Sequence, residues 1–158
     1  MSPEPSPGLT LAVQYAVKAE MLPRWRLRRW VAQAVRMVAQ TRPMTGVMLT
    51  LRLVDSDEGR ELNNTYRGKD YATNVLTFEY GIDQQGVASG DIVLCVPVLY
   101  REAEKQGKPL LDHAAHLVVH GVLHALGYDH IKRDEAQRME ALEAAILARM
   151  GLPDPYQA

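Results

Sequence analysis

Hydrophobic and polar residues along the chain form short alternating runs in some segments and helical stripes in others. The alternation over residues 9–15 and 47–53 predicts two strands that each bury one face. Residues 75–80 predict a third strand, and the mostly apolar residues 91–96 predict a fourth strand inside the sheet. Residues 81–90 are polar and contain glycine, which predicts a connection between the last two strands.

Apolar residues recur at helical spacing between and after these strands. Residues 23–40 carry one apolar stripe behind Pro23, and residues 55–68 begin at candidate N-caps and end at Gly68. Three further helices are expected over residues 97–107, 110–126 and 134–150. The sequence therefore predicts a single α+β domain, in which a mixed sheet of about four strands packs against about five helices.

The N-terminal residues and the cysteine content bear on domain organisation and location. Residues 1–8 form a proline-rich arm that we expect to be disordered, and residues 9–158 form the single domain. The arm lacks the basic and apolar regions of a secretory signal, and no stretch of the chain is apolar enough to span a membrane. Cys95 is the one cysteine, which excludes an internal disulfide and fits a reducing cytoplasm. Its apolar neighbours predict a core residue rather than a nucleophile.

Basic residues are concentrated in one segment of a chain whose net charge is −1. From residue 18 to residue 42, Glu20 is the single acidic residue against Lys18, Arg24, Arg26, Arg28, Arg29, Arg36 and Arg42. Such a patch can bind phosphates whatever the total charge, because the short-range field depends on the nearby charges. It is also typical of a solvated helix face, which the charge pattern alone favours.

Residues 120–130 hold the strongest chemical signal in the sequence. His120 and His124 are one helical turn apart and project from one face of the predicted helix. Gly127 can adopt a positive φ and turn the chain at the helix end, which brings His130 back as a third ligand. Three neutral imidazoles suit zinc and leave a fourth tetrahedral position for a water molecule, which zinc makes acidic. The sequence therefore predicts a catalytic zinc site at His120, His124 and His130, similar to that of zincins.

The histidine spacing matches the H-x-x-x-H-x-x-G-x-x-H pattern of metzincin proteases. Those proteases carry a glutamate general base directly after the first histidine, where this chain has Gly121. Peptide hydrolysis by that route would lack its base. We expect Gly121 instead to open space beside the metal for a bulky substrate such as a nucleotide.

Three other residues near the histidine frame are candidates for supporting roles. His116 lies one turn before His120, but three imidazoles spread over two helical turns cannot all reach one ion. His116 is therefore a candidate proton donor or acceptor near the site, or a packed residue. Asp129 could bind the metal, but we expect it rather to orient a histidine ligand. We expect His113 to lie on the surface.

Four more segments are distinctive when they are taken together with the histidine frame. They are Leu62–Asp70 (LNNTYRGKD), Thr73–Phe78 (TNVLTF), Gly90–Leu94 (GDIVL) and Asp154–Tyr156 (DPY). With the frame they resemble the YbeY family of bacterial endoribonucleases that mature ribosomal RNA. The resemblance covers roughly residues 47–156 and includes no diagnostic match before about residue 45.

The resemblance implies a single zinc ion held by His120, His124 and His130 in a cleft between helices and a mixed sheet. It implies a cytoplasmic enzyme that cleaves single-stranded RNA, trims the 3′ end of small-subunit (16S) ribosomal RNA and acts in ribosome quality control. The implied partners are ribosomal RNA and the ribosome or small-subunit proteins, with no membrane and no disulfide-linked partner. Arg67 falls on the family's functionally important arginine.

The segment around Arg67 suggests how RNA would be bound. Arg67 can donate two parallel hydrogen bonds to a phosphate, and Lys69 adds positive charge. Arg67 could instead form a structural salt bridge with Asp70 or Asp91. Bases could stack on the nearby aromatic residues Tyr66, Tyr71 and Phe78, although we expect Phe78 to be a core residue of its strand.

Several alternatives stay open on the sequence alone. The proton carrier is unassigned between His116 and Asp129, and either a zinc-activated water or the 2′-hydroxyl of the RNA could attack the phosphate. Two other functions are conceivable: a zinc metallopeptidase-like hydrolase, or a non-catalytic ribosome-assembly factor. In the latter, the face from Arg24 to Arg29 would bind RNA or protein, and Arg28 is a candidate RNA contact.

Overall fold

The computed structural model describes residues 7–129 and 131–157, in which four strands form one sheet in the order β1-β2-β4-β3. The strands are β1 (Gly8–Tyr15), β2 (Gly46–Val54), β3 (Val75–Ile82) and β4 (Val87–Cys95). β1, β2 and β4 are parallel, and β3 is antiparallel to β4. β4 therefore lies inside the sheet, as its apolar sequence predicted. Residues 1–6 of the predicted arm lie outside the described residues, and Gly8 already belongs to β1.

The connection between β3 and β4 is shorter than the predicted residues 81–90, and those bounds were wrong. β3 continues to Ile82 and β4 begins at Val87, so the two strands form a hairpin with a short turn. The Asp83 side chain accepts two backbone hydrogen bonds within the turn, and Gly86 has a φ of 85°. Polar residues are compatible with strands here because alternate side chains of an antiparallel edge pair face solvent.

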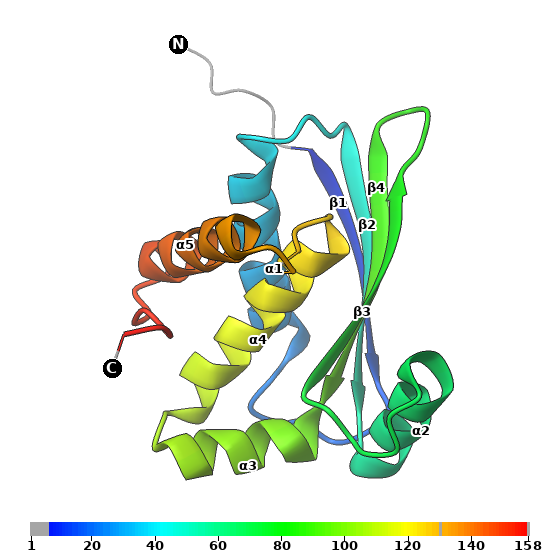
Figure 1. Ribbon diagram of the computed structural model, residues 1–158, viewed down its shortest axis with the longest axis vertical. Coiled ribbons are helices and arrows are strands. Elements are labelled where there is room, and N and C mark those ends of the chain that lie inside the picture. The colour runs from blue at the N-terminus through cyan, green and yellow to red at the C-terminus, as the bar shows by residue number, and fades with distance from the viewer. Residues whose placement is uncertain (1–6, 130, 158) are drawn as a thin grey trace.

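Five helices are formed by the described residues, close to the predicted positions. They are α1 (Arg24–Ala39), α2 (Ser56–Arg67), α3 (Val96–Gln106), α4 (Leu110–Ala125) and α5 (Arg133–Arg149). Figure 1 shows α1, α4 and α5 on one side of the sheet and α2 against the lower part of the other side. The predicted α+β class, with one domain and one mixed sheet, is confirmed.

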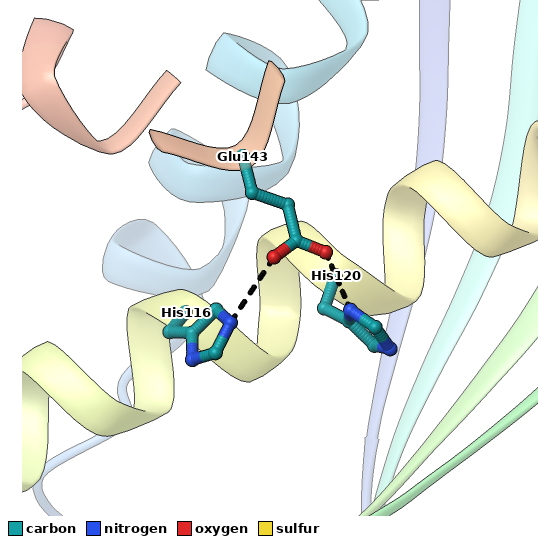
Figure 2. A group of neighbouring side chains, drawn as sticks. All are labelled: His116, His120 and Glu143. Carbon is teal, nitrogen blue, oxygen red and sulfur yellow. Dashed lines mark hydrogen bonds and ion pairs between the residues drawn. The ribbon is translucent and has the colours of Figure 1, made fainter. Parts of the chain in front are cut away.

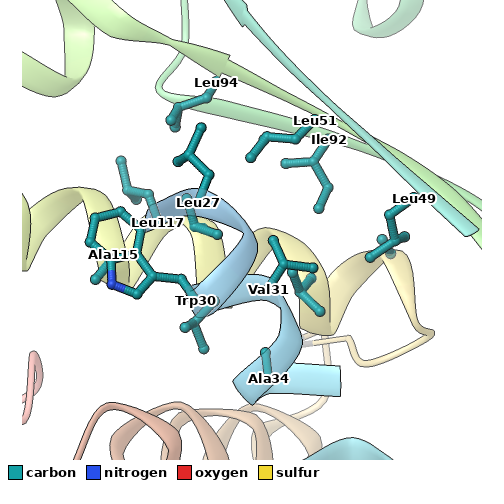
Figure 3. Close-up of a cluster of buried hydrophobic side chains, with 14 of the residues drawn as sticks. Leu27, Trp30, Val31, Ala34, Leu49, Leu51, Ile92, Leu94, Ala115 and Leu117 are labelled. Atoms are coloured by element: carbon teal, nitrogen blue, oxygen red, sulfur yellow. The ribbon is translucent and has the colours of Figure 1, made fainter. Parts of the chain in front are cut away.

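The main core lies between the sheet, α1 and α4 (Figure 3). The predicted stripe of α1 is buried there, including Leu27 and Val31, against Leu51 of β2 and Ile92 of β4. Cys95 is also buried, so its predicted place in the core is confirmed, and burial raises the pKa of its thiol. Along the described part of the chain, no helix is both long and apolar enough to cross a membrane.

The ends of α2 determine where its last residues lie. The Asp55 side chain accepts a hydrogen bond from the Glu58 N–H at 2.9 Å and caps the first turn. Gly68 ends the helix in the left-handed conformation, with a φ of 68°. Arg67 is consequently the last residue of the helix, at the end that reaches the edge of the sheet.

Candidate active site

His120 and His124 lie one turn apart on α4, with ring centroids 4.5 Å apart. The His120 Nδ1 is 2.5 Å from Oε1 of Glu143, and the His124 Nδ1 is 3.0 Å from the carbonyl oxygen of Tyr128. A carbonyl or an ionised carboxylate can only accept a hydrogen bond, so each Nδ1 must carry the proton. The neutral form of each ring therefore has its lone pair on Nε2, and that tautomer can bind a metal ion.

Glu143 is a fully buried carboxylate that holds two histidines of α4 (Figure 2). Its Oε1 accepts from His120, and its Oε2 accepts from Nε2 of His116 at 3.1 Å. Burial alone would raise the pKa of Glu143, but hydrogen bonds from His116, His120 and Tyr156 outweigh it and lower the pKa to about 2. The carboxylate is consequently ionised at neutral pH, as an acceptor for three donors must be.

Tyr156 completes the surroundings of Glu143. Its hydroxyl donates to Oε2 of Glu143, and its backbone N–H donates to Oδ1 of Asp154 at 2.9 Å. Burial and the negative charge of Glu143 raise the pKa of Tyr156, so the hydroxyl stays protonated. The Asp154–Tyr156 segment is thus a turn that holds the tyrosine against the carboxylate.

Glu143 was not predicted as a site residue, although the chain contains a signal for it. The residue occupies the buried stripe of α5, together with Met139, Ile146 and Leu147. Carboxylates are almost never fully buried unless hydrogen-bond donors or positive charges pair with them. A glutamate at an apolar helical position therefore indicates a partner, but the pattern does not say which one.

His116, His120 and Glu143 offer ligand atoms that all lie within 4.8 Å of one another, a group that could hold a metal ion. In the described conformation, the 2.5 Å contact between Glu143 and His120 is a hydrogen bond. Two ligands of a tetrahedral zinc ion would instead lie about 3.3 Å apart, given bonds of about 2.0–2.1 Å. Glu143 thus contacts His120 at Nδ1, and Nε2 is the ring atom of His120 that could bind a metal ion.

A cleft of about 610 Å³ lies between α4, β3 and the C-terminal end of α2. Its lining includes Tyr66 and Arg67 from α2, residues 73–78 from β3 and the loop before it, His120 and His124 from α4, and Asp129. The fold thus brings the arginine that the sequence singled out to the same cavity as two of the predicted ligands. His116 is not among the lining residues and contacts Glu143 instead.

Neither of the acidic partners considered for Arg67 is paired with it in the described part of the structure. Asp70 is held by two hydrogen bonds from Arg60, at 2.7 and 2.9 Å. Asp91 accepts a hydrogen bond from the Tyr80 hydroxyl at 2.7 Å. The salt-bridge alternative for Arg67 therefore has no support among the described residues, and Arg67 is an exposed residue that lines the cleft.

The remaining predicted site residues take different positions. Asp129 is exposed and lines the cleft, whereas Lys69 is exposed beyond the end of α2 and is not among the lining residues. Arg28 lies on the exposed face of α1, outside this cleft. His130 lies outside the described residues, so its role as a ligand stays a prediction.

Two of the three predicted aromatic residues meet at the cleft. The rings of Tyr66 and Phe78 pack edge to face with centroids 5.1 Å apart, and both residues line the cavity. Phe78 also packs against the small core cluster beneath α2, whereas Tyr66 is 63% exposed. Tyr71 is exposed and is not among the lining residues. The cleft therefore offers an aromatic surface directly beside Arg67.

His113 is not on the surface, and that expectation was wrong. It is 4% exposed, and its Nε2 lies 3.0 Å from Oε1 of Glu102 on α3. α3 and α4 pack against each other, so the first turn of α4 is covered. His113 is thus a structural residue that links these two helices.

Gly121 does not open space beside the histidines, and that expectation was also wrong. The residue is buried, and a Cβ atom there would lie 2.8 Å from Cγ2 of Ile92 and 3.4 Å from Cγ2 of Val75. Gly121 therefore allows α4 to approach the sheet closely. A glutamate has no room at this position, so the close packing of α4 against β3 and β4 excludes the metzincin general base.

We expect Gly121→Ala to lower the free energy of unfolding by about 1 kcal/mol. Alanine favours a helix by about 1 kcal/mol over glycine, but overpacking a core costs about 1–3 kcal/mol. The cost should prevail because Ile92 is fully buried and its methyl group would have to move. Urea denaturation of both proteins would measure the difference, and a more stable variant would contradict the close contact.

Comparison with protein families gives one match that covers most of the chain. The family model described as endoribonuclease YbeY matches residues 13–151. The chain is 65% identical over 152 residues to the endoribonuclease YbeY of Bordetella pertussis, covering 95% of this chain and 97% of that protein. It is 49% identical over 158 residues to the endoribonuclease YbeY of Paraburkholderia phytofirmans, with coverages of 96% and 98%.

The fold is also similar to a solved structure. The solution structure of TM1509 from Thermotoga maritima superposes with a TM-score of 0.58 and covers 95% of this chain and 99% of that one. The two sequences are 20% identical, so this likeness bears on the fold alone.

Proposed function

The chain belongs to the endoribonuclease YbeY family, and from that premise we propose that it cleaves single-stranded RNA with a zinc ion held by His120, His124 and His130. As a member of this family it is a hydrolytic endoribonuclease. The zinc ion, the third ligand and the preference for single strands are the finer parts of the proposal.

The observation that carries the proposal is the cleft shared by Arg67, His120 and His124. A phosphodiester that enters it would meet an arginine on one side and two histidines on the other. Arginine is suited to the phosphate because its planar group can donate two parallel hydrogen bonds. The edge-to-face pair of Tyr66 and Phe78 offers a surface on which an adjacent unpaired base can stack.

The donor set fits a zinc ion. The Nδ1 atoms of His120 and His124 both donate hydrogen bonds, so the neutral rings would offer Nε2 to the ion, and the two residues are one helical turn apart. When bound, zinc supplies a Lewis acid for a phosphate oxygen and lowers the pKa of a water molecule. Imidazole ligands also accept other divalent metals, so the identity of the ion is part of what must be tested.

The chain's own residues have distinct tasks in this scheme. The Tyr128 carbonyl and Glu143 orient the two histidines, and His116 acts through Glu143 as a positioning residue. Arg67 binds and orients the phosphate. Asp129 lines the cleft and is the candidate proton carrier.

We also propose the more specific role that the family resemblance implies. The RNA would be the 3′ end of 16S ribosomal RNA, cleaved during maturation and during ribosome quality control in the cytoplasm. The ribosome or small-subunit proteins would be partners. Membership of the family is the support for this assignment.

The role of Arg67 can be tested with a change that keeps the charge. We expect Arg67→Lys to lower kcat/KM for a single-stranded RNA on the order of a hundredfold, because lysine cannot reproduce the paired hydrogen bonds. Zinc content and thermal stability should stay unchanged. Cleavage assays on the zinc-loaded protein, with metal analysis of the same samples, would measure both.

Arg60→Lys is the matched control, since Arg60 lies on the same helix, pairs with Asp70 and does not line the cleft. It should cleave RNA like the unchanged protein. Loss of zinc or of the fold in Arg67→Lys would make Arg67 a structural residue, and full activity would remove it from the site.

A further inference from the structure

α1 contains two tryptophans, and one of them lies outside the core. Trp30 is 7% exposed and points into the main core (Figure 3). Trp25 is 59% exposed, and the guanidinium of Arg26 lies 4.8 Å from the centroid of its ring. An indole left in solvent contributes little to the core, but its flat face can accept a partner.

The exposed tryptophan lies in the most basic segment of the chain. Residues 18–29 contain five basic residues, Lys18, Arg24, Arg26, Arg28 and Arg29, and one acidic residue, Glu20. The first turn of α1 carries no acidic residue. We call Trp25 and these five basic residues the α1 patch. Its positive charge lies on a protein of net charge −1, so its field is local.

A groove of about 750 Å³ borders the α1 patch, between the end of β1 and the start of α1. Its lining includes Tyr15, Lys18, Arg24 and Trp25. Side-chain interactions of Tyr15 and Arg24 fix the two sides of the groove relative to each other. The Tyr15 hydroxyl donates to the carbonyl of Leu22, and the Arg24 guanidinium lies 4.9 Å from the centroid of the Tyr15 ring.

The helix places the charges beside the indole. Trp25, Arg28 and Arg29 are at positions i, i+3 and i+4, so they are neighbours on one face of α1, and all three are exposed. A base stacked on Trp25 would have its flanking phosphates within the reach of the two arginines. Exposed aromatic rings among basic residues are typical of surfaces that bind single-stranded nucleic acid.

We infer that the α1 patch is a second binding site for single-stranded RNA, separate from the catalytic cleft. No residue of the patch lines the cleft of Arg67, His120 and His124. The patch would hold a segment of the RNA away from the cleaved bond and so favour long substrates. The inference rests on the proposed function only in that RNA is the substrate.

Binding can be measured without cleavage, from tryptophan fluorescence of the full chain. We expect a 2′-O-methylated single-stranded RNA of about 30 nucleotides to quench the emission of the exposed Trp25, because a stacked base does so. Trp25→Ala should abolish the quenching, leave the emission of Trp30 and weaken the affinity about tenfold. Absence of quenching in the unchanged protein would overturn the inference.

The charges can be tested separately. Arg28→Glu with Arg29→Glu should weaken binding of the same RNA more than tenfold and reduce the dependence of log K on log salt by about 0.7 for each phosphate that the variant no longer binds. Arg36→Glu is the matched control, on the same exposed face but about 16 Å further along α1 from Trp25. An equal loss of RNA affinity in Arg36→Glu would show a general electrostatic attraction between the protein and RNA instead of a defined binding site. That result would also overturn the inference.

Cleavage rates distinguish this site from the catalytic one. For Trp25→Ala, KM for the RNA of about 30 nucleotides should rise about tenfold with kcat unchanged, while cleavage of an RNA of about six nucleotides should be unaffected. Equal losses of kcat/KM on both substrates would contradict a separate site.

If the Trp25→Ala protein binds RNA as the unchanged protein does but no longer associates with small ribosomal subunits, the inference would be overturned and the patch would be assigned to a protein partner. If the methylated RNA quenches Trp25 but the unmodified RNA of the same sequence is never cleaved, the proposed function fails and this site stands.

Discussion

Replacing His124 by alanine is expected to remove both the zinc ion and RNA cleavage. Structural and catalytic zinc sites need three or four protein ligands, so the loss of one of the three proposed imidazole ligands would leave a weak site. We expect the zinc content to fall from one ion per chain to background, and kcat/KM for single-stranded RNA to fall at least about a thousandfold. Metal analysis and cleavage assays on the same preparation would measure both quantities.

The fold should survive this change, because His124 is only partly buried and its Nδ1 bonds to one carbonyl oxygen. Circular dichroism would verify that. His113→Gln is the matched control, since glutamine can still donate to Glu102 and the position lies about 16 Å along α4 from His124. Its zinc content should stay unchanged. Equal RNA cleavage by the His124→Ala protein and the unchanged one would refute the zinc mechanism.

Replacing Glu143 by leucine is expected to cost about 3–5 kcal/mol in the free energy of unfolding, a large part of the stability of a small domain. The leucine would leave the donors of His116, His120 and Tyr156 without their buried acceptor. It would also release His120 from its tautomer, so zinc affinity should fall about tenfold to a hundredfold. Urea denaturation of the metal-free protein would measure the first effect, and competition with a zinc chelator the second.

Two further variants separate these effects. Glu143→Gln keeps the shape and can still accept one hydrogen bond, so we expect a smaller loss of stability than for leucine but a similar loss of zinc affinity. Glu140→Gln removes an exposed carboxylate one turn earlier on α5 and should change stability by less than about 0.5 kcal/mol. A Glu143→Leu protein as stable as the Glu140→Gln protein would show that the buried carboxylate contributes no net stability.

The buried carboxylate illustrates why the site could be predicted only in part. The i, i+4 spacing of His120 and His124 is a local property of a helix, and the sequence was enough to place both on one face. Their tautomers depend on Glu143 from another helix and on a carbonyl beyond the helix end. Such partners come from packing, and a pattern within one element does not specify them.

Gly121 is a second residue whose role could not be predicted from the sequence alone. Its place after the first histidine was plain in the sequence, and its interpretation as open space beside the metal was wrong. A missing side chain leaves room only where no other atom occupies it, and here Ile92 and Val75 occupy it. The residues that face a glycine belong to other strands, so the distance between α4 and the sheet had to be known first.

The sequence by itself determined the α+β class, the helices and the strands, because burial repeats with the period of each element. It also determined which histidines share a helix face. Only the tertiary structure decided that β3 and β4 form a hairpin, that Glu143 holds His120, and that Arg67 meets His120 and His124 across the sheet edge. The physical reason is that periodicity specifies which face of an element is buried. Which elements then face one another depends on how those buried faces pack together.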